Sequence, residues 1–223
     1  MATSLIVSYD GTPNDDDALA LGRRFAQAGA TLALAYVRHS REFDPRREEL
    51  AQHDAERRLE QGAAGLGDPG IPRHVVVSAS TGEGLANLAE AEGAAAIVFG
   101  SDYRTPPEHS EPGTSAQYLL EGGQVAIAVA AAGLRTRGDA KLASIAVLTP
   151  EGDSVADETA KALAAKVGAT VVDADHGDFD LIVVGSQPDG PDGRVTLSGA
   201  ARSALNRARG SVLVLPRGKP LTF

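Results

Sequence analysis

The sequence has no cysteine and no tryptophan among its 223 residues, and only 4% of the residues are aromatic. The lack of cysteine excludes disulfide frameworks, thiolate catalysis and cysteine-based metal sites. There are 30 acidic and 21 basic residues, so the formal net charge is −9. Phosphate neutralisation needs a basic excess and base stacking needs aromatic side chains. We therefore expect no nucleic-acid partner, and an anionic ligand would require a local site.

Long hydrophobic runs are also missing. None approaches the ~20 residues that a membrane span needs, and the first strand is reached without a basic segment and a long apolar run of the signal-peptide type. We expect a cytoplasmic protein without a membrane partner. No metal site is expected, because the consecutive acids at 15–17 point in different directions on a helix and favour its dipole. The histidines also share no ligand spacing; they are His39, His53, His74, His109 and His176.

One pattern occurs twice in the chain. A buried-looking strand ends in Gly-Ser, a polar loop follows, and a small-residue helix start leads to an apolar strand. The first copy runs from AAAIVFGS (94–101) through Gly113-Thr114 to QVAIAVA, and the second from DLIVVGS (180–186) through Ser198-Gly199 to SVLVLP. A strand, a glycine-containing loop and a helix start together present backbone N–H groups to an anion. The repetition predicts a tandem duplication.

The first copy belongs to a longer alternation of strands and helices. Strands are expected at 4–9, 31–37, 74–77, 94–100 and 125–129, with helices in each interval. Asn14 is expected to cap the first helix, and Asp44-Pro45 to begin the second. Such alternation predicts a doubly wound parallel sheet with helices on both faces, in a domain of residues 1–133.

Residues 133–141 lose apolar periodicity and gain charge and glycine, so they are interpreted as a linker. A second, truncated domain is expected over 142–217, with four strands in place of five. The distance from Gly113 to Val125, compared with that from Ser198 to Val212, predicts a helix two residues shorter in the first domain. We expect the domains to pack through their final strands, 125–129 against 212–215, forming an internal pseudo-dimer that shields both edges. The chain could also form a further homodimer.

The opening SLIVSYDGTPNDDDALALGRRFAQAGATLALAYV resembles the start of universal stress proteins. Nucleotide-binding members of that family carry Gly, two residues, Gly, nine residues, then Gly-Ser or Gly-Thr. Gly100, Tyr103, Gly113 and Thr114 stand at this spacing, and three of the four positions match. The resemblance covers nearly all of residues 2–132 and, more thinly, 142–216. It implies two lobes with the universal stress protein-like, adenine nucleotide alpha hydrolase-like fold.

The resemblance also implies a binding site. Asp10 and Val37 would contact adenine and ribose, with Ser8 beside the ring, and Gly100, Gly113 and Thr114 would hold the phosphates. Tyr103 occupies the position of the family's second glycine. The implied cofactor is ATP or a related adenine nucleotide, with or without Mg²⁺. The sequence carries no positioned base or metal motif. Hence we assign no catalytic residue and expect at most slow ATP hydrolysis.

Departures from the family pattern leave two functions open. Tyr103 at a left-handed position would cost roughly 1 to 2 kcal/mol, unless the loop takes a different path. The loop is also acidic and contains Pro106, Pro107 and Pro112. The protein is therefore either a stress-response module that binds an adenine nucleotide in its N-terminal lobe, or a nucleotide-free module for protein interaction with decayed sites. An adenylating enzyme would need Ser-Gly-Gly-x-Asp-Ser after the first strand, which this chain lacks.

The second lobe departs further from the pattern. Pro188 and Ser198 stand at glycine positions, Gly199 stands at the hydroxyl position, and Thr149-Pro150-Glu151 replaces the opening aspartate. No nucleotide is expected in this lobe.

Overall fold

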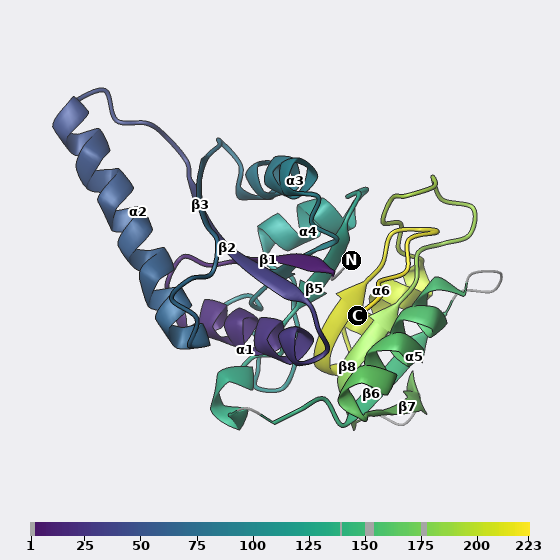
Figure 1. The fold of residues 1–223 in the computed structure, drawn as a ribbon. Helices are drawn as coiled ribbons and strands as arrows, with labels where there is room; N and C mark the ends of the chain where they lie inside the picture. Colours follow the sequence, from purple (N-terminus) through teal and green to yellow (C-terminus); the bar gives the residue numbers. More distant parts are fainter. Residues whose placement is uncertain (1–2, 139, 150–153, 175–177) are drawn as a thin grey trace.

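One sheet of nine strands forms the centre of the computed structural model (Figure 1), which describes residues 3–138, 140–149, 154–174 and 178–223. The strands are β1 (Ser4–Ser8), β2 (Thr31–Arg38), β3 (Arg73–Val77), β4 (Ala96–Phe99), β5 (Ala126–Val129), β6 (Ser144–Leu148), β7 (Thr170–Asp173), β8 (Asp178–Val184) and β9 (Arg209–Val214). Their order across the sheet is β3-β2-β1-β4-β5-β9-β8-β6-β7. Adjacent strands are parallel except β5 and β9, which are antiparallel. The expected α/β fold is confirmed.

Helices cover both faces of this sheet. They are α1 (Pro13–Gln27), α2 (Pro45–Leu66), α3 (Thr81–Glu92), α4 (Thr114–Leu120), the 3₁₀ helix η1 (Leu134–Arg137), α5 (Val155–Val167) and α6 (Gly199–Leu205). Successive strand residues point to opposite faces, so Leu5 and Val7 pack into one core and Ile6 into the other. Residues of α1, α2 and α5 complete the first core, and residues of α3, α4 and α6 complete the second. Each core therefore runs through the whole sheet.

The start of α1 differs from the expectation. The cap is Thr12, and Pro13 is the first helical residue, where its fixed φ and missing N–H are tolerated best. Asn14 is the second helical residue, and its Nδ2 donates to the carbonyl oxygen of Ser101 at 2.8 Å. The predicted Asn14 cap was wrong because proline fixes the helix start two residues earlier. The second helix begins at Asp44-Pro45 as predicted, and Asp44 caps it by accepting from the N–H groups of Arg46 and Arg47.

The predicted packing of the final strands is also confirmed. In the antiparallel pair, Ile127 lies opposite Val214, Ala128 opposite Leu213, and Val129 opposite Val212. We call β1–β5 with their helices the N-terminal half, and β6–β9 with theirs the C-terminal half. Because β5 and β9 pair with each other, neither half leaves the edge of its final strand exposed.

The loops that follow β4 and β8 make matching hydrogen bonds. Ser101 Oγ donates to the carbonyl of Ala130 at 2.6 Å, and Ser186 Oγ donates to that of Leu215 at 2.7 Å. The N–H of Glu111 donates to Ser101 Oγ at 3.2 Å, and that of Thr196 to Ser186 Oγ at 3.0 Å. The two halves are therefore built on the same local plan.

Each of these loops also crosses to the other half. Ser110 Oγ donates to the carbonyl of Gly210 at 2.6 Å, and the N–H of Gly210 donates to the carbonyl of Glu108 at 2.8 Å. In return, the N–H of Val195 donates to the carbonyl of Gly123 at 2.8 Å. The junction thus consists of one strand pair flanked by two exchanged loops.

The predicted difference in helix length was wrong. Both α4 and α6 have seven residues. The extra residues of the C-terminal half lie in β9, which has six residues against four in β5. Between α4 and β5 the chain turns tightly, and the N–H of Gly123 donates to the carbonyl of Leu119 at 2.8 Å.

The predicted linker is packed against α1. Its residues 134–137 form η1, and Leu134 is buried. Asp17 is fully buried; its carboxylate accepts from the N–H groups of Gly133 at 2.9 Å and Arg135 at 2.8 Å, and from the Arg135 guanidinium at 2.6 Å. Asp139 lies outside the described residues. Asp17 therefore fixes the connection between the halves.

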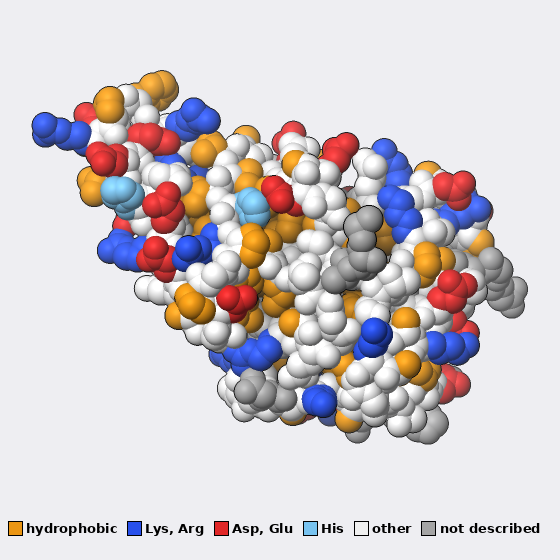
Figure 2. Space-filling model, viewed as in Figure 1, with side chains coloured by type: hydrophobic (Ala, Val, Ile, Leu, Met, Phe, Trp, Pro, Cys, Tyr) orange, Lys and Arg blue, Asp and Glu red, His pale blue; other side chains and the backbone are white. Residues whose placement is uncertain are grey.

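Helix α2 extends away from the body at its N-terminal end (Figure 1). Phe43 and Leu50 are exposed there, and Figure 2 shows hydrophobic side chains at this outer end among charged ones. On the face drawn in Figure 2, basic and acidic side chains are interspersed. Within the described part of the chain, no helix has both the length and the apolar composition to cross a membrane.

Candidate functional site

The order of the strands defines a switch point between β1 and β4. Strand β1 pairs with β2 on one side and with β4 on the other, and all three are parallel. The chain therefore leaves β1 and β4 at the same edge of the sheet, towards helices on opposite faces. In doubly wound sheets, ligands bind in the crevice at this place. Asp10 follows β1 and Gly100 follows β4, so both predicted site residues lie at this edge.

Asp10 is exposed and lies in a turn that is held by hydrogen bonds of Asp10 itself and of Asp15. Its Oδ1 accepts from the N–H of Thr12 at 3.0 Å, and its N–H donates to Oδ2 of Asp15 at 2.7 Å. Its carbonyl oxygen accepts from Nη1 of Arg58, on α2, at 2.7 Å. The loop is thus held from both α1 and α2.

Asp10 and Asp15 titrate as a pair. Hydrogen bonding with Asp15 lowers the pKa of Asp10. Burial, followed by the hydrogen bond to Asp10 and its negative charge, raises the pKa of Asp15 to about 8. Close to neutral pH, the Asp15 carboxyl is therefore protonated and that of Asp10 is ionised. Nearby, burial and Asp16 raise the pKa of Tyr9 to about 12, and Tyr9 Oη donates to Asp16 Oδ1 at 3.4 Å.

Ser8 is the last residue of β1 and Val37 the next-to-last residue of the neighbouring strand β2, beneath this loop. Ser8 is half-buried and closes β1. Val37 is buried in the core on the α3 side, where a Cβ added to Gly84 would lie 3.3 Å from its Cγ1. Beyond β2, His39 Nε2 lies 3.5 Å from Thr81 Oγ1. Ser8 can therefore border the crevice, whereas the side chain of Val37 is engaged in packing.

Gly100 lies against the first turn of α1. A Cβ at this position would overlap the backbone carbonyl of Asn14, and the Asn14 side chain is bonded to the next residue, Ser101, as described above. Only glycine permits this approach. The crevice between β1 and β4 is therefore narrow, with the start of α1 as one wall.

Tyr103 does not take a left-handed conformation. Among the described residues other than glycine, only Glu108 has a positive φ, of 71°. Tyr103 is 73% exposed, and the Arg104 guanidinium lies 4.9 Å from the centre of its ring. The loop thus takes a different path from the one that the glycine spacing implies, and the phenol does not fill the crevice.

Most of the N–H groups in the loop after Ser101 have partners within the protein. The N–H of Asp102 donates to Glu111, those of Arg104 and Thr105 to Asp102, that of Glu108 to Ala132, that of His109 to Pro106, and that of Glu111 to Ser101. This loop therefore offers few backbone donors to a phosphate chain.

Gly113 and Thr114 remain accessible. Gly113 caps α4 with extended backbone, Thr114 is its first residue, and a Cβ on Gly113 would meet no atom within 4 Å. Both residues line a cavity of about 650 Å³ between α4 and α6, together with Arg202 and Asn206. Asp10, Ser8, Val37 and Gly100 do not line this cavity. The structure therefore divides the predicted site residues into two separate groups, one at Asp10 and Gly100 and one at Gly113.

The sequence did not reveal three contributors to this region. Asn14 bridges to the β4 end, Arg58 holds the Asp10 loop, and Asp15 accepts from the N–H of Asp10. A carboxylate three residues into a helix after Thr-Pro could have indicated the role of Asp15. No sequence signal indicates that Arg58, 48 residues away, reaches Asp10.

In the C-terminal half, the corresponding positions have structural contacts. Ser198 Oγ caps α6 by accepting from the N–H of Ala201 at 3.0 Å. Pro150 and Glu151, at the place of the opening aspartate, lie outside the described residues. Elsewhere in the described chain, no group of three or more His, Asp or Glu side chains is arranged to hold a metal ion.

Comparison with known proteins finds a matching family and structures with a similar fold. The model of the universal stress protein family matches residues 1–131. A universal stress protein from Archaeoglobus fulgidus DSM 4304 is 15% identical with a TM-score of 0.61, covering 96% of this chain and 98% of its own. A functionally unknown protein from Pseudomonas aeruginosa PAO1 is 14% identical with a TM-score of 0.63, covering 97% and 93%. At this identity the structures show a shared fold. No curated protein matches the sequence. Because the family model covers more than half of its residues, the chain belongs to the universal stress protein family.

Proposed function

We propose that the protein is a stress-response module that binds an adenine nucleotide, ATP or a relative of it, at the carboxyl edge of its N-terminal half. The observation that carries this proposal is the switch point between β1 and β4, with Asp10 after one strand and Gly100 after the other. The exposed Asp10 carboxylate is available to a ribose or adenine donor. Ser8 borders the same crevice.

The phosphate end of the nucleotide would lie towards Gly113 and Thr114. Thr114 adds a hydroxyl, and Gly113 leaves room for close approach. Asp102 and Glu111 stand nearby, and like charge disfavours a long phosphate chain unless Mg²⁺ accompanies it. The site holds no positioned general base, so hydrolysis would be slow.

A second candidate function is a nucleotide-free interaction module. It is favoured by the loop of residues 101–112, whose N–H groups are largely bonded internally and which crosses to Gly210. In this alternative the role of the loop is to hold the two halves of the chain together. We propose further that the matching bonds of Ser101 and Ser186 descend from a duplication, in line with the repeated sequence pattern.

Nucleotide release and titration distinguish the two functions. Freshly purified protein is heat-denatured, the supernatant is analysed for nucleotides, and ATP is titrated calorimetrically with and without Mg²⁺. Binding that weakens about tenfold in Asp10→Ala, with an unchanged melting temperature, supports the nucleotide site. Absence of both released nucleotide and titration heat, in a folded sample, supports the interaction module.

Two glycine variants serve as matched controls. Gly100→Ala would push the start of α1 away and lower the melting temperature, whereas Gly113→Ala has free space around it and should leave the fold intact. Weaker ATP binding in Gly113→Ala, without loss of stability, would support close approach of the ligand there. Unchanged binding in Gly113→Ala would place the phosphates elsewhere.

A further inference from the structure

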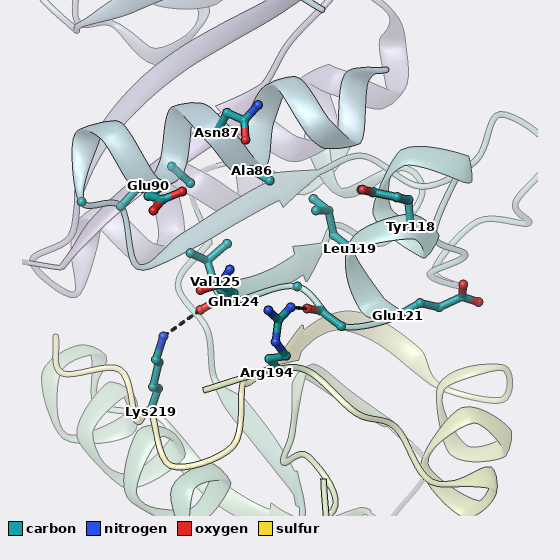
Figure 3. A pocket seen from close by; sticks show the side chains of 15 residues that line it. Ala86, Asn87, Glu90, Tyr118, Leu119, Glu121, Gln124, Val125, Arg194 and Lys219 are labelled. Carbon is teal, nitrogen blue, oxygen red and sulfur yellow. Dashed lines mark hydrogen bonds between the residues drawn. The ribbon is translucent and has the colours of Figure 1, made fainter. Parts of the chain in front are cut away.

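A second cavity lies at the opposite edge of the N-terminal half, where β4 and β5 begin. It has a volume of about 500 Å³ and is lined by residues of both halves (Figure 3). Helix α3 and the turn between α4 and β5 supply one side, and Arg194 and Lys219 of the C-terminal half supply the other. Because Asp10 and Gly100 follow the carboxyl ends of their strands, this cavity is separate from the candidate nucleotide site.

The lining of this cavity is mixed, with polar groups around an aliphatic patch. Ala86 and Ala89 of α3, Leu119 of α4, and Val125 before β5 form this patch. Ala89 and Leu119 are almost fully buried, whereas Ala86 and Val125 are partly exposed. The volume is within the range of small-molecule sites.

Two cations are anchored at the rim. Nη1 of Arg194 donates to the carbonyl of Gly122 at 2.9 Å, and Nζ of Lys219 donates to the carbonyl of Gln124 at 3.1 Å. A guanidinium has five N–H donors and an ammonium three, so both groups retain donors for a ligand. The bond from Val195 to Gly123 holds the segment next to Arg194 against the same turn. The cations are therefore placed before any ligand arrives.

The cavity is lined by two cations and two carboxylates in different places. Figure 3 shows Glu90 and Asn87 on α3, across the cavity from Arg194 and Lys219. The second carboxylate, Glu121, follows α4, and its side chain extends away from Arg194 (Figure 3). An anionic group is attracted to the side of the two cations and repelled from that of Glu90. The apolar surface between these two sides can hold a hydrocarbon body.

From this arrangement we propose that the cavity binds a small organic anion, in which one carboxylate, sulfonate or phosphate group is attached to an apolar ring or short chain. The anionic group bonds to Arg194 and Lys219 in charge-assisted hydrogen bonds. The apolar body packs beneath α3 against Ala86 and Val125, whose side chains are partly exposed. Since both halves supply the walls, the site exists only in the assembled chain.

Two fluorescent probes test the assignment. 8-Anilinonaphthalene-1-sulfonate carries a ring system and an anion, and N-phenyl-1-naphthylamine carries the rings without the charge. We expect saturable binding of the sulfonate, about tenfold tighter than that of the neutral probe. Equal affinities, or no saturable binding of the sulfonate to the folded protein, would overturn the proposal.

Charge variants test where the sulfonate binds and whether positive charge at the cavity strengthens its binding. Arg194→Gln and Lys219→Gln should each weaken sulfonate binding about tenfold, Arg194→Lys should restore part of it, and Glu90→Gln should strengthen it two- to threefold. None of them should change the affinity of the neutral probe. Lys161→Gln, on the exposed face of α5, is the matched control and should bind like the unaltered protein.

Two further measurements test whether a change in probe binding comes from unfolding of the variant or from binding at the nucleotide crevice. Each variant is melted to show that it unfolds cooperatively, and ATP is added to the probe complex. Displacement of the sulfonate by ATP together with insensitivity to Arg194→Gln would place the probe in the nucleotide crevice and refute the proposal. Retention of the probe in excess ATP supports a separate site, whether or not a nucleotide binds at Asp10.

Discussion

Ala128 of β5 lies directly opposite Leu213 of β9 in an antiparallel pair. The residue before Ala128 therefore faces the residue after Leu213, and the residue after Ala128 faces the residue before Leu213. Ile127 meets Val214 and Val129 meets Val212. The preceding loops show a matching exchange, with Ser110 bonded to Gly210 and Val195 bonded to Gly123. This arrangement is that of an isologous two-fold contact between subunits, here within one chain.

The first prediction concerns the tightest point of this junction. Gly210 has a φ of 132°, and a Cβ there would overlap the carbonyl oxygen of Phe179. Gly210→Ala should therefore lower the free energy of unfolding by more than about 2 kcal/mol, from backbone strain and overlap together, as measured by urea denaturation. Gly199→Ala, at the open start of α6, is the control and should change stability by less than about 0.5 kcal/mol. Similar stabilities of the two variants would mean that the junction is loose.

The second prediction concerns the connection between the halves. Asp17→Ala removes a buried carboxylate that receives two N–H groups and the guanidinium of Arg135. The two backbone N–H groups lose their acceptor, and each unsatisfied buried donor costs about 1 to 3 kcal/mol, so we expect a decrease of about 2 to 6 kcal/mol in urea denaturation. Lys161→Ala breaks an exposed pair with Asp157 and should cost less than about 0.5 kcal/mol. A mild effect of Asp17→Ala would show that η1 is held mainly by Leu134.

The existence of the strands could be inferred from the sequence because the apolar runs are short, bounded by glycine or charge, and alternate with amphipathic helices. The pairing of the final strands followed from the need to protect two apolar edges, as at Ile127 and Val214. The helix lengths could not be inferred in this way. The distance from Gly113 to Val125 does not reveal that Gly122 and Gly123 form a tight turn and that β9 starts earlier than β5.

The candidate site was less predictable than the fold. Gly100 follows β4 and Gly113 caps the start of α4, but the glycine spacing implied a loop path that Tyr103 does not follow. Two contacts decide that path. Ser101 bonds to Ala130 within the half, and Ser110 bonds to Gly210 in the other half. Long-range hydrogen bonds of this kind leave no periodic trace in a sequence.

The third prediction concerns Arg24 on α1. Its side chain is buried, burial lowers the pKa of its guanidinium, and Nε and Nη1 have no hydrogen-bond partner among the described residues. Unpaired buried donors cost free energy that an apolar residue of similar length avoids. Arg24→Met should therefore leave stability unchanged or raise it by about 1 to 2 kcal/mol, measured by thermal and urea denaturation. The exposed Arg57→Met is the control, and a loss above about 1 kcal/mol in Arg24→Met alone would reveal a partner for the guanidinium.

The fourth prediction concerns pH and the carboxyl pair of Asp10 and Asp15. The pKa of Asp15 is about 8 in the folded protein against 3.8 for the free group, so between these values the folded state binds more protons than the unfolded state. Stability must then fall as pH rises from about 5 to 8. One pKa unit corresponds to about 1.4 kcal/mol, so even part of this shift is measurable. Asp10 acts in the opposite direction, but its lowered pKa confines its contribution to acidic pH, where stability falls as pH decreases.

Asp15→Asn separates these effects. The amide keeps an oxygen that can accept from the N–H of Asp10, and it cannot ionise. The melting temperature of the variant should therefore decrease less than that of the unaltered protein between pH 5 and pH 8, with the largest gain at pH 8. Asp54→Asn, on the exposed face of α2, should leave the pH profile unchanged. Parallel profiles for Asp15→Asn and the unaltered protein would mean that Asp15 ionises in the folded protein as it does in the unfolded chain, and that its carboxyl is not protonated at neutral pH.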